Sequence, residues 1–172
     1  MKGIPGDRQG NTFAAFDLAK NPGMKPAYER CLAVAEGREW CALLAGPYGT
    51  GKTHLAEAAI IATGYRGMFW KVPDFLRWIR AQVFDHGWPE DRIVGPYRDA
   101  PGLVVFDDLG TQKDSEWATE QLYLVLDSRC DQRLPTIITT NSPTEKLDGR
   151  IFSRYQTGLV VCKGRDVRAV SA

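Results

Sequence analysis

The feature that most constrains this chain is the run from Gly46 to Thr53, GPYGTGKT, which matches the phosphate-binding pattern G-x-x-x-x-G-K-[ST] at every fixed position. A backbone can curl its N–H groups around a phosphate only where glycine permits conformations that other residues avoid. Lys52 adds a point charge, and the Thr53 hydroxyl suits a magnesium ion that bridges the last two phosphates of a nucleoside triphosphate. We expect nucleotide contacts along the whole stretch and at the residue after it: Gly46, Pro47, Tyr48, Gly49, Thr50, Gly51, Lys52, Thr53 and His54.

The residues on both sides of this stretch predict the strand, loop and helix that a phosphate-binding loop requires. Residues 40–45, WCALLA, form a short apolar run suited to a buried strand. Residues 54–62, HLAEAAIIA, are strong helix formers, and a helix that begins here presents its positive end to a bound anion. The alternative, a glycine-rich turn that contains a lysine by chance, leaves this flanking order unexplained.

Composition limits the classes of protein to which the chain can belong. Its 172 residues are typical of one domain, and its net charge of +1 gives no overall attraction to nucleic acid or membrane, so any site for a polyanion must be local. The four cysteines are far apart, which favours reduced thiols over a zinc site or a disulfide framework. No apolar run approaches the roughly 20 residues of a membrane span, and the first residues lack the core of a signal peptide. We therefore expect a soluble, cytoplasmic protein without membrane contact.

Strands and helices are predicted to alternate along the chain, as in an α/β sheet. After the phosphate loop and its helix, apolar and β-branched runs predict strands over residues 68–72, 103–108, 136–141 and 158–162. Amphipathic or capped segments predict helices over residues 26–37, 74–84, 115–129 and 144–155. Residues 85–101 contain Gly-Trp-Pro and Gly-Pro sequences and show little periodicity, so no element is predicted there.

Two predicted strands end in polar groups that suit triphosphate chemistry. In an α/β sheet such groups gather at the ligand crevice, beside the phosphate loop. Asp107, at the end of an apolar run, is the expected magnesium partner of Thr53, and Asp108 can orient or deprotonate the attacking water. Asn141 can hydrogen-bond both the γ-phosphate and that water. Ordinary alternatives exist, because two acids can cap a turn and an asparagine before a Ser-Pro pair is typical of a turn.

Two groups of aromatic residues leave their role open. Phe13 and Phe16 precede the predicted nucleotide site and can cover a base or pack onto the core. Trp78 lies between Arg77 and Arg80 on the predicted helix, where cations interleaved with an aromatic can hold single-stranded nucleic acid. A solvated helix face explains the same three residues.

Four motifs occur in an order that resembles a known family: G46-P-Y-G-T-G-K-T53, L103-V-V-F-D-D-L-G110, T136-I-I-T-T-N141 and R150-I-F-S-R154. The chain resembles the AAA+ ATPases of the DnaC/DnaI helicase-loader and IstB group over about residues 12–170, and the DnaC-like members in particular. The resemblance implies an α/β, three-layer P-loop NTPase fold with a five-stranded parallel sheet, without a C-terminal lid, in which the sensor strand lies between the phosphate-loop and Walker B strands. Residues 1–12 are then a poorly ordered N-terminal segment and residues 13–172 an AAA+ ATP-binding domain.

The same resemblance assigns roles around Mg²⁺ and ATP. Thr53 and Asp107 become metal ligands, and Asp108, Asn141 and Arg154 become catalytic residues. Asn141 corresponds to the γ-phosphate sensor of the family. Arg154 corresponds to an arginine finger that reaches into the site of a neighbouring subunit, with Arg150 in support. Arg168 is a candidate substitute for the sensor arginine that a lid usually carries.

The resemblance also implies partners. Arg80, Phe84, Ser115 and Trp117 fall near positions that face single-stranded DNA in DnaC-like proteins, and self-association into an oligomer or filament is expected. A replicative helicase is a further partner to test. Helicase loaders bind it through a separate N-terminal segment, whereas only residues 1–12 precede the expected domain.

The resulting hypothesis is a DnaC-like AAA+ ATPase that binds and slowly hydrolyses Mg·ATP in a site shared between subunits, as a DNA replication accessory on single-stranded DNA. One alternative is an IstB-like transposition ATPase that binds duplex DNA. Another is an interaction module switched by nucleotide with negligible hydrolysis. A small-molecule kinase shares the phosphate loop but leaves Asn141 and the pair Arg150 and Arg154 unexplained.

Overall fold

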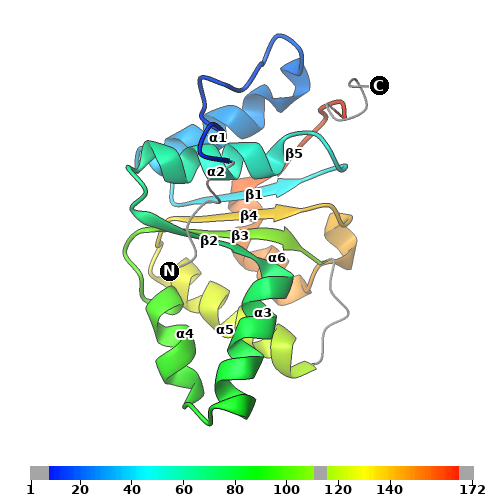
Figure 1. The fold of residues 1–172 in the computed structure, drawn as a ribbon. Helices are drawn as coiled ribbons and strands as arrows, with labels where there is room; N and C mark the ends of the chain where they lie inside the picture. Colours follow the sequence, from blue (N-terminus) through cyan, green and yellow to red (C-terminus); the bar gives the residue numbers. More distant parts are fainter. Residues whose placement is uncertain (1–7, 111–115, 167–172) are drawn as a thin grey trace.

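The computed structural model describes residues 8–110 and 116–166 and has a five-stranded sheet at its centre (Figure 1). The strand order is β2-β3-β4-β1-β5, and every neighbouring pair is parallel. The strands are β1 (Cys41–Ala45), β2 (Gly67–Lys71), β3 (Leu103–Leu109), β4 (Thr136–Thr140) and β5 (Leu159–Val161). The expected α/β fold is confirmed, and so is the position of the sensor strand β4 between β3 and β1.

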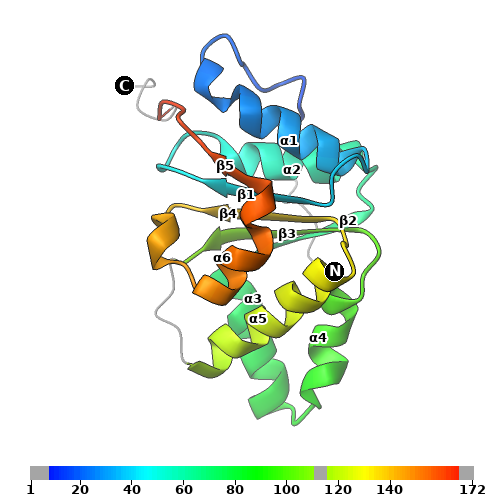
Figure 2. The same ribbon diagram turned by 180° about the vertical axis from the view of Figure 1, so that it is seen from behind.

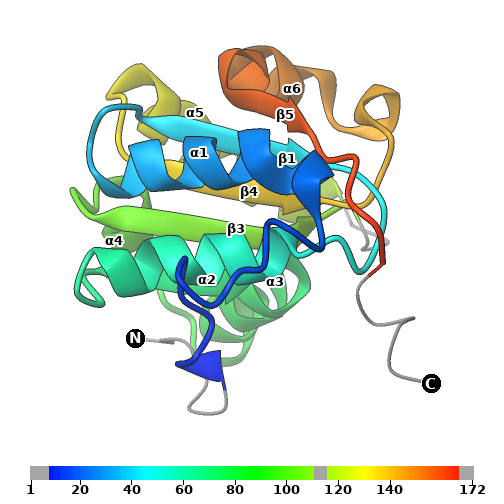
Figure 3. The ribbon, with the colours of Figure 1, turned by 90° about the horizontal axis from the view of Figure 1, so that it is seen from above.

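Helices cover both faces of the sheet and complete three layers (Figures 1 and 2). On one face, α1 (Lys25–Ala35) and α2 (Lys52–Ala62) lie side by side (Figure 3). The opposite face carries α3 (Val72–Arg80), α4 (Glu90–Arg98), α5 (Glu116–Asp131) and α6 (Gly149–Tyr155). Short 3-10 turns occur at Pro22–Met24, Thr144–Lys146 and Gln156–Gly158, and α3 continues into a π-helical turn at Ala81–Asp85.

The central strands β1, β3 and β4 are mostly apolar or β-branched because successive side chains point to opposite faces and both faces are covered. On β1, Leu44 packs toward α1 and α2, whereas Leu43 packs toward the other four helices. On β3, Val105 and Phe106 divide in the same way. Helices therefore cover both faces of the sheet. The carboxyl ends of the strands are left accessible to a ligand.

Two of the sequence predictions differ from the structure in the helical layer. Residues 90–98 form α4, where no element was predicted. Gly95 and Pro96 within the helix hid it from the sequence prediction, whereas Ile93, Val94 and Tyr97 are buried at helical spacing and hold it against the core. The predicted helix over residues 144–155 is divided. Its second part, α6, is N-capped by Asp148, whose carboxylate accepts a hydrogen bond from the Arg150 backbone N–H over 2.8 Å.

The N-terminal residues that the structure describes are tied to α2. Arg8 Nη1 donates to Glu57 Oε1 over 2.9 Å, and Asn11 Nδ2 donates to the other carboxylate oxygen over 2.6 Å. Glu57 is fully buried, so these two partners compensate the burial of its charge. Residues 8–12, which belong to the segment expected to be poorly ordered, thus make defined contacts, and residues 1–7 lie outside the described residues.

Two further properties of the described segments concern the cysteines and the lengths of the helices. All four cysteines are free thiols, and three of them are buried. Within residues 8–110 and 116–166, every helix is too short or too polar to cross a bilayer.

Candidate nucleotide-binding site

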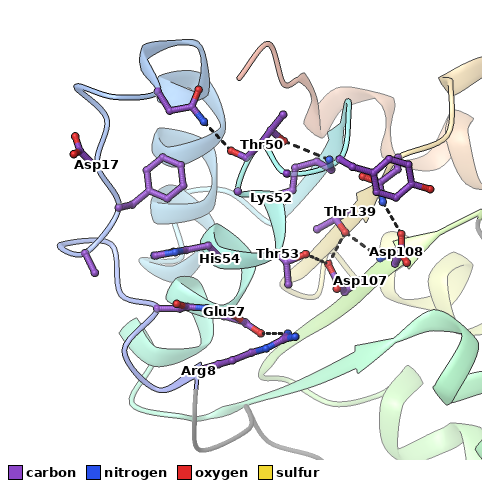
Figure 4. Close-up of a pocket in the computed structure, with 18 of the residues that line it drawn as sticks. Arg8, Asp17, Thr50, Lys52, Thr53, His54, Glu57, Asp107, Asp108 and Thr139 are labelled. Atoms are coloured by element: carbon purple, nitrogen blue, oxygen red, sulfur yellow. Dashed lines mark hydrogen bonds and ion pairs between the residues drawn. The ribbon is translucent and has the colours of Figure 1, made fainter. Parts of the chain in front are cut away.

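A cavity of about 650 Å³ opens at the carboxyl ends of β1, β3 and β4 (Figure 4). Three parts of the chain line it. The first is the N-terminal segment from Arg8 to Asn21, the second is the phosphate loop with the start of α2, and the third is the set of polar residues at the ends of β2, β3 and β4. Residues 48–54 of the predicted loop, both acids and Asn141 therefore line one cavity, whereas Gly46 and Pro47 are not among its lining residues.

The phosphate loop holds its shape through glycine conformations that other residues rarely adopt. Gly49 has φ of +75° and Gly51 has φ of +99°. A Cβ atom at Gly51 would also lie 2.6 Å from Phe16 Cε2, too close for any side chain. Gly51 immediately precedes α2, so the positive end of the helix faces the cavity.

Lys52 is directed inward and is only 5% exposed. Its Nζ donates to the carbonyl oxygens of Gly46, over 2.8 Å, and Pro47, over 2.6 Å. These bonds compensate the partial burial of the ammonium group. They place a fixed positive charge inside the loop, next to the helix N-terminus.

Asp107 is the buried acid of the site, and two threonine hydroxyls donate to one of its oxygens. Thr53 Oγ1 lies 2.9 Å from Asp107 Oδ1, and Thr139 Oγ1 lies 2.6 Å from the same atom (Figure 4). Burial raises the pKa of Asp107, and the hydrogen bonds from Thr139 and Thr53 oppose that rise. Thr139 was missed by the sequence analysis. Its only signal in the sequence was that Thr139 is a polar residue near the end of the strand sequence TIITT.

The oxygen atoms of Thr53 and Asp107 suit a magnesium ion. Mg²⁺ prefers oxygen ligands and commonly takes one or two from the protein, with the rest from water and substrate phosphates. Among the described residues there is no cluster of three His, Cys, Asp or Glu side chains that could hold a metal alone. Thr53 and Asp107 would therefore hold Mg²⁺ together with the phosphates of a bound nucleotide.

Asp108 is presented to the cavity by a local irregularity in β3. The register of β3 against β4 shifts between Phe106 and Leu109, and Asp108 has φ of +68°, a left-handed conformation that is strained for a residue with a Cβ atom. Asn141 Nδ2 donates to Asp108 Oδ1 over 2.6 Å. The two residues predicted to contact the γ-phosphate and the water are thus hydrogen-bonded to each other.

The N-terminal segment forms the wall opposite the strand ends. Phe16 lines the cavity and its ring meets His54 edge-on, with centroids 5.2 Å apart. Both phenylalanines also lie against Tyr28, with ring centroids 5.0 Å away for Phe13 and 6.3 Å away for Phe16, but Phe13 does not line the cavity. Asn21, which sequence reasoning also missed, is buried and donates from Nδ2 to the Thr50 carbonyl oxygen over 3.0 Å.

Arg150 and Arg154 both lie on α6, and neither lines the cavity of its own chain. Arg154 pairs with Asp127 and Asp131 of α5, at 2.7 and 2.9 Å. Arg150 pairs with two other acids and lies over the Tyr123 ring, 4.2 Å from its centroid. The predicted action of Arg154 on a neighbouring subunit stays a prediction.

Three of the four residues predicted to contact DNA lie together, and none of the three lines the cavity. The rings of Phe84 and Trp117 have centroids 5.3 Å apart, and the Arg80 guanidinium lies 5.9 Å from the Phe84 centroid. Phe84 is 64% exposed. Ser115 and Arg168 lie outside the described residues.

The arrangement of Trp78 between two free arginines is not found. The Trp78 ring packs on Trp70 and Tyr97, with centroids 5.5 Å from each, because the α3 face that carries it is turned toward the core. Arg77 pairs weakly with Asp74 at 3.5 Å. Trp78 is therefore part of an aromatic cluster and does not present a stacking surface between the two cations.

The sheet is parallel, a glycine loop precedes the N-terminus of α2, and Thr53 on that helix donates to Asp107 on β3. Together these features define a P-loop nucleotide-binding domain. Residues 11–154 match the family described as IstB-like ATP binding protein, and the chain belongs to this family.

Relatives in the family come from two settings. The chain is 29% identical to an ATP-binding protein in an insertion sequence of Mycobacterium tuberculosis, over 76% of this chain and 53% of the relative. It is 30% identical to an insertion sequence ATP-binding protein of Sinorhizobium fredii, over 78% and 46%. The replicative helicase loader DnaC of Escherichia coli is 26% identical over 67% and 50%. The chain thus spans about half the length of these relatives.

Solved structures agree on the fold. The crystal structure of the DnaC helicase loader superposes with a TM-score of 0.75 and 23% identity, over 92% of this chain and 99% of that one. Domain III of the replication initiation protein DnaA from Thermotoga maritima gives a TM-score of 0.78 and 23% identity, over 94% and 68%. The chain therefore shares its fold with these two structures.

Proposed function

We propose that this protein is an AAA+ ATPase that hydrolyses Mg·ATP in a site completed by a neighbouring subunit, and that it acts on DNA. The observation that carries this proposal is the different environment of the two adjacent acids on β3. Both line the cavity, but Asp107 is buried and accepts from two threonine hydroxyls, whereas Asp108 is less buried and accepts from Asn141. One acid is thus suited to a metal ion and the other to a water molecule.

The proposed reaction is an in-line attack of water on the γ-phosphate. Lys52 and the N-terminal end of α2 bind and orient the phosphates, and Thr53 with Asp107 would hold Mg²⁺, which neutralises phosphate charge when bound. Asp108 orients the attacking water and accepts its proton. Asn141 fixes the Asp108 carboxylate through the 2.6 Å hydrogen bond and can donate to the γ-phosphate as well.

Arg154 is proposed to act between subunits. It lies on α6, outside the cavity of its own chain, which supports a role on a neighbour's nucleotide. An arginine supplied in this way contributes about 10³–10⁵-fold to turnover in related phosphoryl-transfer systems. We therefore expect an isolated subunit to be a poor enzyme.

The proposed target is single-stranded DNA, in the role of a replication accessory, with a replicative helicase as a further candidate partner. The cluster of Arg80, Phe84 and Trp117 supports this choice, because an exposed aromatic ring beside a cation suits a base and its phosphate. The helicase loader among the relatives supports it as well.

A second candidate is an ATPase of transposition that binds duplex DNA. The family match and the two insertion sequence relatives favour it. Duplex binding dominated by phosphate contacts would weaken steeply as salt is raised. The two candidates share the same ATP site and differ in the nucleic acid that stimulates it.

Phosphate release measured over a range of protein concentrations tests the ATPase proposal. Turnover per subunit is expected to rise as subunits associate, and single-stranded DNA should stimulate it more than a duplex of the same sequence. Lys52→Ala should abolish nucleotide binding, and Asp108→Asn should bind Mg·ATP without turnover. Strong stimulation by duplex alone would favour the transposition role. Tight Mg·ATP binding without turnover at any concentration, with or without DNA, would leave only a nucleotide-switched interaction module.

A further inference from the structure

Helices α5 and α6 pack against each other (Figure 2), and ion pairs join them beside their buried apolar contacts. Both arginines of α6 meet acids of α5. Arg150 Nη1 lies 3.0 Å from Glu120 Oε2, and Arg154 lies between Asp127 and Asp131. Arg154 is the residue proposed to reach a neighbouring subunit. The ion pairs that hold it on its own chain therefore affect that role.

Both terminal nitrogens of Arg154 are engaged. Nη2 lies 2.7 Å from Asp127 Oδ1, and Nη1 lies 2.9 Å from Asp131 Oδ1. The two aspartates are four residues apart on α5, so they lie one helical turn apart on the same face and grip the guanidinium from two positions. A phosphate group is recognised by the same planar fork of N–H donors. Of the two nitrogens, Nη1 donates a hydrogen bond to Asp131, whereas the contact of Nη2 with Asp127 is an ion pair without hydrogen-bond geometry.

We propose that Asp127 and Asp131 form a clamp that holds Arg154 on its own chain, and that a neighbour's triphosphate obtains the arginine by exchange with these carboxylates. This inference rests on the proposed action of Arg154 between subunits. If Arg154 is exchanged in this way, the clamp restrains ATP turnover in the assembled protein. This effect is separate from any contribution of the ion pairs to stability.

The exposure of the clamp fits such an exchange. The Arg154 side chain is 39% exposed and that of Asp131 is 59% exposed, so water screens this ion pair and keeps it weak enough to open. Asp127, at 24%, is the more buried member. When Arg154 leaves, two like charges remain one turn apart, which opposes its release. Neutralising the aspartates should therefore free the arginine.

Chemical modification tests the clamp without any need for activity. Phenylglyoxal, an arginine-selective reagent, is applied to wild type and to Asp127→Asn/Asp131→Asn, and modification at Arg154 is followed by peptide mass spectrometry. Release of two exposed pairs should speed modification of Arg154 about 2- to 30-fold. Glu120→Gln, which removes the matching ion pair of Arg150, should leave the Arg154 rate unchanged. The single variant Asp131→Asn serves if the double variant fails to fold. An unchanged Arg154 rate in a folded variant would refute the clamp.

Turnover then tests its consequence. At protein concentrations where subunits associate, Asp127→Asn/Asp131→Asn should hydrolyse ATP several-fold faster than wild type, and adding Arg154→Ala should bring turnover down to that of Arg154→Ala alone. If Arg154→Ala has full activity, the proposed function itself fails. If Arg154→Ala is inactive but the double variant is no faster than wild type, only the clamp inference is overturned.

Discussion

The Thr139 hydroxyl donates to Asp107 Oδ1 over 2.6 Å, and its oxygen accepts a hydrogen bond from the Asp108 backbone N–H over 3.0 Å. One buried hydroxyl on β4 therefore connects both acidic residues of β3. It orients the carboxylate that would hold the metal and supports the backbone that presents the water-orienting acid.

Replacing Thr139 by valine keeps its shape but removes this hydroxyl. The Asp108 N–H would lose its partner and Asp107 would lose a donor, so we expect a loss of about 1–3 kcal/mol in the free energy of unfolding. Turnover should fall at least about tenfold, the effect of roughly 1.4 kcal/mol on the barrier, while ATP affinity changes little because the phosphate loop is intact. Denaturant titration measures the stability, phosphate release measures the turnover, and calorimetry measures the ATP affinity. Thr139→Ser should restore both stability and turnover. Wild-type turnover in the valine variant would contradict the assigned role.

A second prediction concerns the pH dependence contributed by Asp107. Burial raises the pKa of this carboxyl in the folded state above its ordinary value of 3.8, so the folded protein binds more protons than the unfolded chain in the pH range above that value. Stability from this group is therefore greatest at low pH and falls as pH rises through the folded pKa. Asp107→Asn should raise the free energy of unfolding near neutral pH by about 0.5–2 kcal/mol, as relief of a functional-site strain commonly does.

The measurement is denaturant unfolding of the nucleotide-free protein as a function of pH. The advantage of Asp107→Asn should shrink as pH falls toward 3.8, where the wild-type carboxyl becomes neutral. Magnesium-dependent turnover should be lost at every pH. A variant that is less stable than wild type at neutral pH would show that the hydrogen bonds from the threonines outweigh the burial of the charge.

The backbone strain at Asp108 gives a third prediction. With φ of +68°, any residue with a Cβ atom is strained there, whereas glycine is not. Asp108→Gly should therefore be more stable than Asp108→Ala by about 1 kcal/mol, the reverse of the order at an ordinary helical position. Both variants lack the carboxylate and should be equally inactive. Thermal unfolding of the pair isolates the strain, and a more stable alanine variant would argue against the left-handed conformation.

The sequence predicted the sheet well because its central strands β1, β3 and β4 are buried on both faces and therefore read as apolar or β-branched runs. It also located the phosphate loop, Asp107, Asp108 and Asn141, because each of these stands directly after or at the end of such a run. Local signals were enough for these features.

Features that depend on distant partners could not be predicted in this way. Arg129 is fully buried and donates to backbone carbonyls of Tyr97, Ala100, Gly102 and Pro135, an environment that lowers its pKa to about 10 through desolvation. Glu57 is neutralised by Arg8, which lies 49 positions away in the sequence. A charged residue within a helix normally indicates a solvated face, and only the tertiary fold shows that these two are buried.

A fourth prediction tests the action of Arg154 between subunits. Arg154→Ala and Asp108→Asn should each be inactive, since one lacks the donated arginine and the other lacks the water-orienting acid. In mixtures, some interfaces combine an intact Asp108 with an intact Arg154, so part of the ATPase activity should return. Titrated mixtures that stay inactive, although both variants bind ATP and associate, would remove the support for a shared site.

The last prediction concerns the cluster of Arg80, Phe84 and Trp117. Phe84→Ala removes a ring that is 64% exposed, and loss of one stacked base should weaken single-strand binding by about 1–3 kcal/mol. Arg80→Ala should weaken binding and lower its dependence on salt, because one phosphate contact is lost. Arg66→Ala, an exposed arginine that directly precedes the amino end of β2, provides the charge-matched control, because α3 follows the other end of that strand. Fluorescence anisotropy with a labelled oligonucleotide measures affinity, and ATP binding should be unchanged in all three variants. If Phe84→Ala and Arg80→Ala bind DNA as Arg66→Ala does, the cluster is an ordinary part of the surface, and DNA contacts must be sought elsewhere.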